Sequence, residues 1–335
     1  MNFQKEILAR RKRRNAKALK KHAFNTPSHP RRRAGTNGRE ILQAMTCVLA
    51  IDLGGTNLRA ALHNGDIAAL QMLTHEAAPS SLDDFRNRVG ALADEAGDIT
   101  AIGLAVPGLV EGSSCRWIPN LPYLDGQNLQ ELFPEFTVAV GNDAQIAMLA
   151  EAVEGAARSL TDALLLAIGT GIGSAVLAGD RIVAGAQGGA CSFGWACADT
   201  NDAGEDRSGW LERSASGRAL DIVAARLGLA NGSALISAAR SGEGAAIAAL
   251  EVPMRSLGTA LAGAVALLNP QAILISGGIA DALDMMKPPL LAALRRQLPP
   301  HLRDINIRPG AFGSRAGLVG AALAGAAGAG WRQIR

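Results

Sequence analysis

Two stretches of this chain, about 115 residues apart, each place a glycine- and threonine-rich turn directly after an apolar run. The first run starts at Val48 and reaches Gly54-Gly55-Thr56, and the second starts at Ala163 and reaches Gly169-Thr170-Gly171. A further apolar run follows each turn, so each unit is predicted to be strand, turn and strand. Two-residue hairpin turns are predicted after these units, at Asn64-Gly65 and at Gly179-Asp180. Glycines in such a turn let backbone N–H groups approach an anion closely. The repeated unit predicts a duplicated clamp for the phosphates of a nucleotide.

The common nucleotide-binding motifs do not explain these turns. A Rossmann motif requires a helix after the glycines and a third glycine where Ser174 stands, and a Walker loop requires Gly-Lys-Ser/Thr. Either turn alone has an ordinary glycine-rich turn as its alternative interpretation. In the first unit, Asp52 at the strand end is a candidate for holding a cation such as Mg²⁺, and Thr56 and Asn57 add polar side chains beside the turn.

Two further loops carry candidate ligand-binding residues. The apolar run from Ile99 to Val110 contains Gly108, and a loop at the end of a strand is a common place for a ligand contact. The loop from Ile118 to Gly126 contains two prolines, and Asn120 is its best ligand-binding polar residue. An Asx-turn role for Asn120 is the alternative.

The strand predicted at Thr137 to Val140 ends in Gly141-Asn142-Asp143, and a helix is predicted from Ala144 to about Ala157. Asp143 therefore lies at a strand-to-helix junction. One interpretation is an N-cap, because aspartate satisfies an unpaired N–H there. The other is a general base that points into a cleft.

The composition fits a folded chain of 335 residues, with 48% hydrophobic and 19% charged residues. None of the four cysteines forms a CxxC pair, which argues against a zinc ribbon and a thioredoxin motif. Scattered cysteines favour a reducing compartment, so we expect a cytoplasmic protein. The run from Ala316 to Gly330 is apolar but shorter than a membrane span, and we expect a closely packed helix rather than an anchor.

The charge is divided between two parts of the chain. Residues 1–44 hold 13 basic and 2 acidic residues, a balance of +11, and the remaining residues hold 20 basic and 28 acidic, a balance of −8. The acidic body argues against nucleic-acid binding through the folded part. The basic segment could bind nucleic acid or an anionic membrane, or act as an organelle transit peptide. The favoured interpretation is a disordered extension or a mis-assigned start, with Met45 as the true first residue.

Taken in order, these motifs resemble the ROK family of sugar kinases, within the actin/hexokinase/Hsp70-like ATPase superfamily. The resemblance covers about Thr46 to Gln333. The matching segments are Asp52 to Thr56, Asn142 to Ala144, Gly169 to Gly173, Asn269-Pro270 with Ile275 to Ile279, and Ala316 to Ala322.

The chain departs from the family pattern after the second hairpin. Ser192 stands where a sugar-contacting glutamate is usual, and Trp195 stands where a histidine that binds sugar and zinc is usual. Trp210 stands where the family has a further cysteine that binds zinc. Of the family's zinc-binding residues only Cys197 remains, and one ligand does not form a zinc site, so we expect none. Glu212 is retained, and the resemblance implies a sugar contact near the anomeric end. A helix N-terminal acid is the alternative for Glu212.

The resemblance implies an α/β fold with two lobes, of the actin-like or ribonuclease-H-like ATPase type, around an interlobe cleft. We expect a small lobe of residues 45–142 plus 316–335 and a large lobe of residues 143–315. It further implies ATP-dependent phosphorylation of a hexose or hexose derivative, glucokinase-like or N-acetylhexosamine-kinase-like, by a homodimer that needs Mg²⁺. Asp143 would be the general base, Asn142 would bind sugar, and adenosine would lie against Gly277 and Gly278. The competing hypothesis is a catalytically weak sugar-binding or regulatory protein on the same scaffold.

Overall fold

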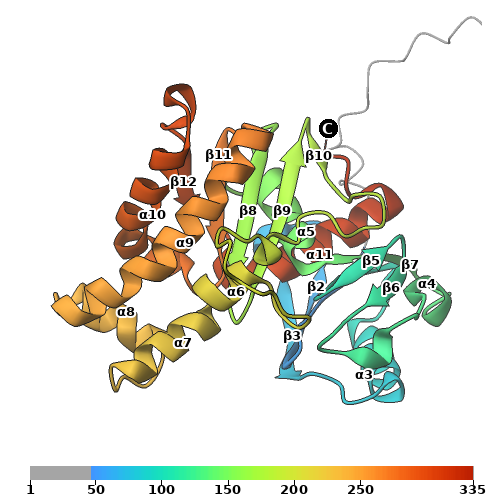
Figure 1. Ribbon diagram of the computed structural model, residues 1–335. Coiled ribbons are helices and arrows are strands. Elements are labelled where there is room, and N and C mark those ends of the chain that lie inside the picture. The colour runs from blue at the N-terminus through green and yellow to red at the C-terminus, as the bar shows by residue number, and fades with distance from the viewer. Residues whose placement is uncertain (1–46, 335) are drawn as a thin grey trace, which may run out of the picture. The chain divides into compact units, whose positions relative to one another are not determined.

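The computed structural model describes residues 47–334, so the basic segment of residues 1–44 lies outside the described residues. Two five-stranded sheets form the framework (Figure 1). The first has the order β3-β2-β1-β4-β7, and its strands are β1 (Val48–Leu53), β2 (Asn57–His63), β3 (Gln71–Ala77), β4 (Ala101–Val106) and β7 (Thr137–Asn142). The second has the order β10-β9-β8-β11-β12, and its strands are β8 (Ala163–Ile168), β9 (Ile172–Ala178), β10 (Arg181–Ile182), β11 (Ala272–Ser276) and β12 (Asn306–Pro309).

The two sheets repeat one topology. In each, the first strand pairs antiparallel with the next strand in sequence and parallel with a later one, as β1 does with β2 and β4 and β8 does with β9 and β11. A mixed α/β fold with a duplicated strand–turn–strand unit is therefore confirmed.

The helices lie between these strands in sequence, except for the last one, which follows β12. They are α3 (Leu82–Ala96), α4 (Leu129–Leu132), α5 (Asp143–Val153), α6 (Trp210–Ala215), α7 (Gly217–Arg226), α8 (Gly232–Arg240), α9 (Gly244–Leu268), α10 (Leu283–Gln297) and α11 (Ala316–Ala327), and a small hairpin consists of β5 (Leu109–Glu111) and β6 (Ser114–Trp117). One of the hydrophobic cores draws residues from both sheets together with α5 and α11. These two helices join the sheets, as Figure 1 shows.

Close helix packing explains the small residues of α11. A Cβ on Gly320 would lie 1.9 Å from the carbonyl oxygen of Ile146 on α5, and one on Gly103 would lie 1.8 Å from the carbonyl oxygen of Ala321. Glycine is therefore required where α11 crosses α5 and β4. Within residues 47–334, none of the helices is both long and apolar enough to cross a membrane.

Several local predictions can be compared with the structure. A serine followed by two aspartates, as at Ser81, Asp83 and Asp84, predicts a helix start. Ser81 Oγ does cap α3, by accepting from Asp84 N at 3.1 Å. The predicted turn Gly179-Asp180 joins β9 to β10, with positive φ at both residues. The predicted two-residue turn at Asn64-Gly65 is wrong, because Asp66 caps a 3₁₀ turn, Ile67–Ala69, that lengthens the connection to β3. Helix α5 also ends at Val153, earlier than predicted.

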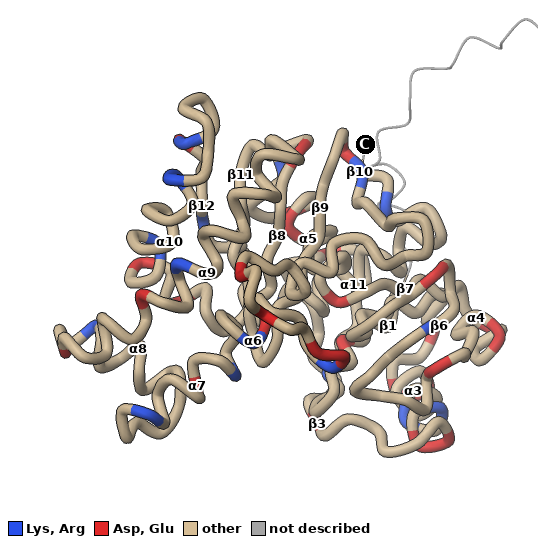
Figure 2. Tube along the Cα trace, in the orientation of Figure 1, with Lys and Arg blue, Asp and Glu red and all other residues tan. Residues whose placement is uncertain are grey.

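Acidic and basic positions are mixed along the helices and loops of the described part (Figure 2). The lobe boundaries and the homodimer stay predictions.

Candidate active site

Asp52 and Arg59 form an ion pair across the first hairpin. The two residues are directly opposite in the register of β1 and β2. Arg59 Nη2 donates to Asp52 Oδ2, and Arg59 Nη1 donates to the carbonyl oxygen of Ser314 at 2.7 Å. Burial raises the pKa of Asp52, and the Arg59 guanidinium opposes that shift. Arg59 is a site residue that the sequence prediction missed, although the hairpin register could have indicated it.

Asp143 is the first residue of α5 and is half-buried. Its Oδ1 accepts from Ala144 N at 2.7 Å. Burial raises the pKa of Asp143 to about 6; the hydrogen bond from Ala144 lowers it, and the negative charge of Asp52 raises it further. The N-cap position itself belongs to Asn142, so the N-cap interpretation of Asp143 is wrong, although its carboxylate bonds the same N–H.

Both polar atoms of the Asn142 side chain have partners in the chain. Its Oδ1 accepts from Ala144 N at 3.0 Å, and its Nδ2 donates to the carbonyl oxygen of Gly108 at 2.9 Å. Gly108 has a φ of +134°, and a Cβ there would lie 2.3 Å from the carbonyl oxygen of Trp117. The structure thus brings two predicted sugar-site residues into contact.

The tip of the first hairpin lies beside Asn120. A Cβ on Gly55 would lie 2.8 Å from Asn120 Cβ. Gly55, Thr56 and Asn57 are exposed, and Asn57 Nδ2 donates to Thr56 Oγ1 at 3.0 Å. This tip has exposed backbone and a hydroxyl group for a ligand.

The tip of the second hairpin is held on the N-terminus of α7. The carbonyl oxygen of Gly169 accepts from Gly217 N at 2.7 Å, and that of Thr170 accepts from Arg218 N at 3.4 Å. Gly169 and Thr170 remain exposed.

The predicted adenosine-side glycines lie beside the same hairpin. A Cβ on Gly277, whose φ is +83°, would lie 2.5 Å from the carbonyl oxygen of Ile168. Gly278 is exposed, with no atom within 4 Å of a Cβ built on it. The end of β11 therefore meets the end of β8.

Glu212 lies in the first turn of α6 and also contacts the second hairpin. Its Oε2 accepts from Ile172 N at 3.0 Å. A Cβ on Gly171 would lie 2.6 Å from that oxygen, and one on Gly194 would lie 3.4 Å from it. Glu212 is therefore a first-turn acid of α6, as the alternative interpretation expects, and it also contacts the second hairpin.

Ser192 and Trp195 lie on the segment before α6. Ser192 is exposed, and its hydroxyl donates to the carbonyl oxygen of Gly189 at 3.2 Å. Trp195 is 46% exposed, so it is accessible to a ligand. Trp210 is half-buried and packs against the core of the second sheet.

The described residues 47–334 contain no cluster of three or more His, Cys, Asp or Glu side chains able to hold a metal ion. Asp52 lies near the end of β1, directly before the first hairpin tip, and its negative charge acts on Asp143. Mg²⁺ in phosphoryl-transfer sites is commonly held by one or two carboxylates together with phosphate oxygens and water. Asp52 with Asp143 nearby therefore fits such an ion, provided that phosphate supplies further ligands.

Comparisons with known proteins identify the family of this chain. The sequence model described as the ROK family matches residues 48–326. Kanosamine kinase of Amycolatopsis mediterranei (strain S699) is 30% identical over 301 residues, which are 84% of this chain and 97% of that protein. N-acetylgalactosamine kinase AgaK of Shewanella sp. (strain ANA-3) is 28% identical over 301 residues, 82% of this chain and 95% of that protein. The crystal structure of a ROK family glucokinase from Streptomyces griseus in complex with glucose and AMPPNP has a TM-score of 0.69 at 25% identity, covering 82% of this chain and 98% of that chain.

Proposed function

Because the chain belongs to the ROK family, we propose that it transfers the γ-phosphoryl group of ATP to a hydroxyl of a hexose or hexose derivative, with Asp143 as general base. Relatives named as kinases of kanosamine and N-acetylgalactosamine support a sugar as the acceptor. The neighbouring structure with glucose and AMPPNP supports ATP as the donor.

The position of Asp143 carries this proposal. Its carboxylate interacts electrostatically with Asp52 of the first hairpin. The next residue, Ala144, contacts the second hairpin, because a Cβ on Gly173 would lie 3.3 Å from Ala144 Cβ. A half-buried carboxylate whose pKa is raised to about 6 thus interacts with the first hairpin, and the residue after it contacts the second. Such a group is ionised at neutral pH and is still basic enough to accept a proton from an attacking hydroxyl.

The residues then have distinct roles. Asp143 accepts the proton of the sugar hydroxyl as its oxygen attacks the γ-phosphorus. Backbone N–H groups of Gly54, Gly55 and Thr56, and of Gly169 to Gly171, stabilise the phosphate oxygens. Asp52 would hold Mg²⁺, which supplies neutralisation of charge on the transferring phosphoryl group. The adenosine lies against Gly277 and Gly278.

The sugar site follows from the neighbouring side chains. Asn120 and Glu212 bind sugar hydroxyls, and Asn142 holds Gly108 in place beside them. Ser192 is uncharged and offers one hydroxyl, which forfeits the stronger hydrogen bond of a carboxylate, worth about 1.5–3 kcal/mol. Trp195 adds an apolar face that stacks on a sugar ring or on a substituent such as an acetamido group. We therefore expect weak use of glucose and better use of a substituted hexose.

The test is ATP turnover over a panel of glucose, N-acetylmannosamine, N-acetylgalactosamine and kanosamine, with wild type and Asp143→Asn. The asparagine can still accept the 2.7 Å hydrogen bond from Ala144, so we expect the fold and ATP binding to persist. Loss of a general base lowers kcat by about 10²–10⁴-fold. Variant activity within threefold of wild type would refute the role of Asp143. Sugar binding without turnover by the wild type would favour the regulatory alternative, which the uncharged Ser192 supports.

A further inference from the structure

The segment that joins Trp195 to α6 folds as a loop whose ends meet. A Cβ on Gly209 would lie 2.2 Å from Trp195 Cα, and Leu211 N donates to the carbonyl oxygen of Ala196 at 3.2 Å. The segment of residues 196–208 therefore begins and ends beside the backbone of Gly194 and Trp195.

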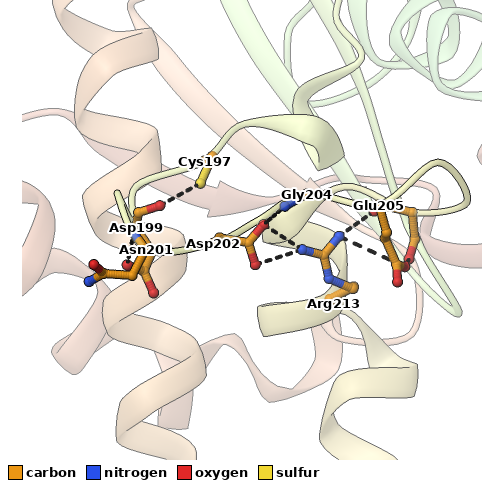
Figure 3. Close-up of polar contacts among 8 residues, drawn as sticks. Cys197, Asp199, Asn201, Asp202, Gly204, Glu205 and Arg213 are labelled. Atoms are coloured by element: carbon orange, nitrogen blue, oxygen red, sulfur yellow. Dashed lines mark hydrogen bonds and ion pairs between the residues drawn. The ribbon is translucent and has the colours of Figure 1, made fainter.

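Arg213 holds the interior of the loop, as Figure 3 shows. Its Nη2 lies 2.7 Å from both carboxylate oxygens of Asp202, and its Nη1 donates to the carbonyl oxygen of Ser208. Glu205 Oε1 lies 3.8 Å from Nη1. One guanidinium thus binds three points spread along the loop.

The loop residues also bind one another. Asp202 Oδ1 accepts from Gly204 N at 2.9 Å, and Asp199 Oδ1 accepts from Asn201 N at 2.9 Å. Cys197 Sγ donates to the carbonyl oxygen of Asp199 at 3.1 Å (Figure 3). The hydrogen bonds from Arg213 lower the pKa of Asp202, which keeps this carboxylate ionised at neutral pH.

Arg213 directly follows Glu212 in the short helix α6, and the two side chains bind different parts of the chain. Glu212 contacts the second hairpin through Ile172 N, whereas Arg213 contacts the loop. A Cβ on Gly194 would lie 3.4 Å from Glu212 Oε2, so the carboxylate and the residue before Trp195 are neighbours.

We propose that Arg213 is a positioning residue of the sugar site: by holding the loop of residues 196–208 on α6, it fixes Trp195 and Glu212 relative to each other. This inference rests on the proposed function. A planar guanidinium can bind Asp202 and Ser208 at once with two nitrogens, and a lysine ammonium has only one nitrogen. Charge alone therefore does not replace Arg213.

The test compares Arg213→Lys with wild type in the full chain. Amide hydrogen exchange is measured at Asn201 and Gly204 in the loop, and at Leu211 and Ile172, whose N–H groups report the loop ends and Glu212. KM values are measured for D-glucose, N-acetyl-D-mannosamine and ATP. The matched control is Arg240→Lys, which changes an arginine that donates to Asp284 at 2.8 Å in the same lobe but far from α6 in sequence.

In Arg213→Lys we expect exchange at all four amides to rise at least about tenfold, the KM of the better sugar to rise at least about fivefold, and the KM of ATP to stay within twofold. The control should change none of these. Unchanged exchange in the loop would overturn the inference, and so would faster loop exchange with unchanged Ile172 exchange and unchanged sugar KM. If the wild type shows no turnover, the proposed function is contradicted. The amide exchange rates at Leu211 and Ile172 still test the positioning role of Arg213 in that case, because they do not depend on turnover.

Discussion

The carboxylate of Glu212 accepts a hydrogen bond of 3.0 Å from the backbone N–H of Ile172, 40 residues earlier in the chain. Ile172 directly follows the Gly169-Thr170-Gly171 turn, and Glu212 is proposed to bind a hydroxyl group of the sugar. The bond therefore joins a residue proposed to bind the acceptor to the hairpin proposed to bind the donor. A substitution at Glu212 should therefore change the KM of the sugar. It should also change the KM of ATP if the new side chain cannot accept the hydrogen bond from Ile172 N.

Glu212→Gln and Glu212→Ala separate these two effects. Glutamine keeps an oxygen acceptor for Ile172 N. We therefore expect a higher KM for the sugar and a KM for ATP within about twofold of the wild-type value. Alanine leaves a buried N–H unsatisfied, at a cost of about 1–3 kcal/mol in stability, and we expect it to raise both KM values. Two-substrate kinetics and a thermal melt measure these outcomes. Equal effects of both variants on ATP would show that the bond does not support the hairpin.

The pH dependence of turnover follows from the pKa of Asp143. Burial raises that pKa to about 6, so the carboxylate is protonated and cannot accept a proton below this pH. We expect log(kcat/KM) for the sugar to rise with a slope of one as pH increases through about 6, and then to level off. The profile of wild type between pH 4.5 and 8.5, corrected for ATP ionisation, is the measurement. A flat profile down to pH 5 would contradict an ionised Asp143 as the base.

Local sequence signals predicted the parts of the site that are formed by short segments. Both glycine-rich tips and the strand before Asp143 follow from apolar runs that end in glycine or aspartate. The Gly179-Asp180 turn was predictable because its two residues suit positive φ. The Asn64-Gly65 prediction failed because the Asp66 side chain accepts from Ala68 N and starts a 3₁₀ turn, which outweighs the hairpin preference of Asn-Gly.

Contacts between distant segments were not predictable in this way. The fully buried Glu151 carboxylate accepts from Ala156 N at 2.8 Å and from Ala311 N at 2.9 Å, 160 residues away, and so binds the end of α5 to the segment before α11. Nothing in the periodicity of α5 distinguishes this glutamate from an exposed one. Arg213 was missed for the same reason, because its partners lie in an irregular loop.

The crossing of α11 and α5 gives a prediction for stability. A Cβ on Gly320 would lie 1.9 Å from a backbone oxygen of Ile146, which cannot move away as a flexible side chain would. We expect Gly320→Ala to cost at least about 2 kcal/mol, because overpacking of a tight core displaces backbone. Gly263→Ala on α9 is the matched control, because it lies in a helix with no atom within 4 Å of its Cβ.

For the control we expect a gain of about 0.5–1 kcal/mol from helix propensity. Because unfolding entropy scales with length, a change of 1 kcal/mol shifts Tm by about 1.5 °C in a chain of this size. Gly320→Ala should therefore lower Tm by at least about 3 °C, and Gly263→Ala should raise it slightly. Thermal melts of wild type, Gly320→Ala and Gly263→Ala measure these Tm values. A Tm for Gly320→Ala equal to that of wild type would show that α11 can shift away from α5.

The last prediction concerns zinc. Trp195 and Trp210 occupy positions where the resemblance expects zinc ligands, and an indole N–H is a donor only. Trp210 packs against the core, and the Cys197 thiol donates to the carbonyl oxygen of Asp199. Arg213 binds Asp202 within the loop that contains Cys197. We expect less than about 0.1 zinc per chain by elemental analysis of protein purified without added metal. Dialysis against EDTA, followed by restoration of Mg²⁺, should return full activity and an unchanged Tm. About one zinc per chain, or activity restored only by zinc, would overturn this prediction and would require ligands other than the two tryptophan positions.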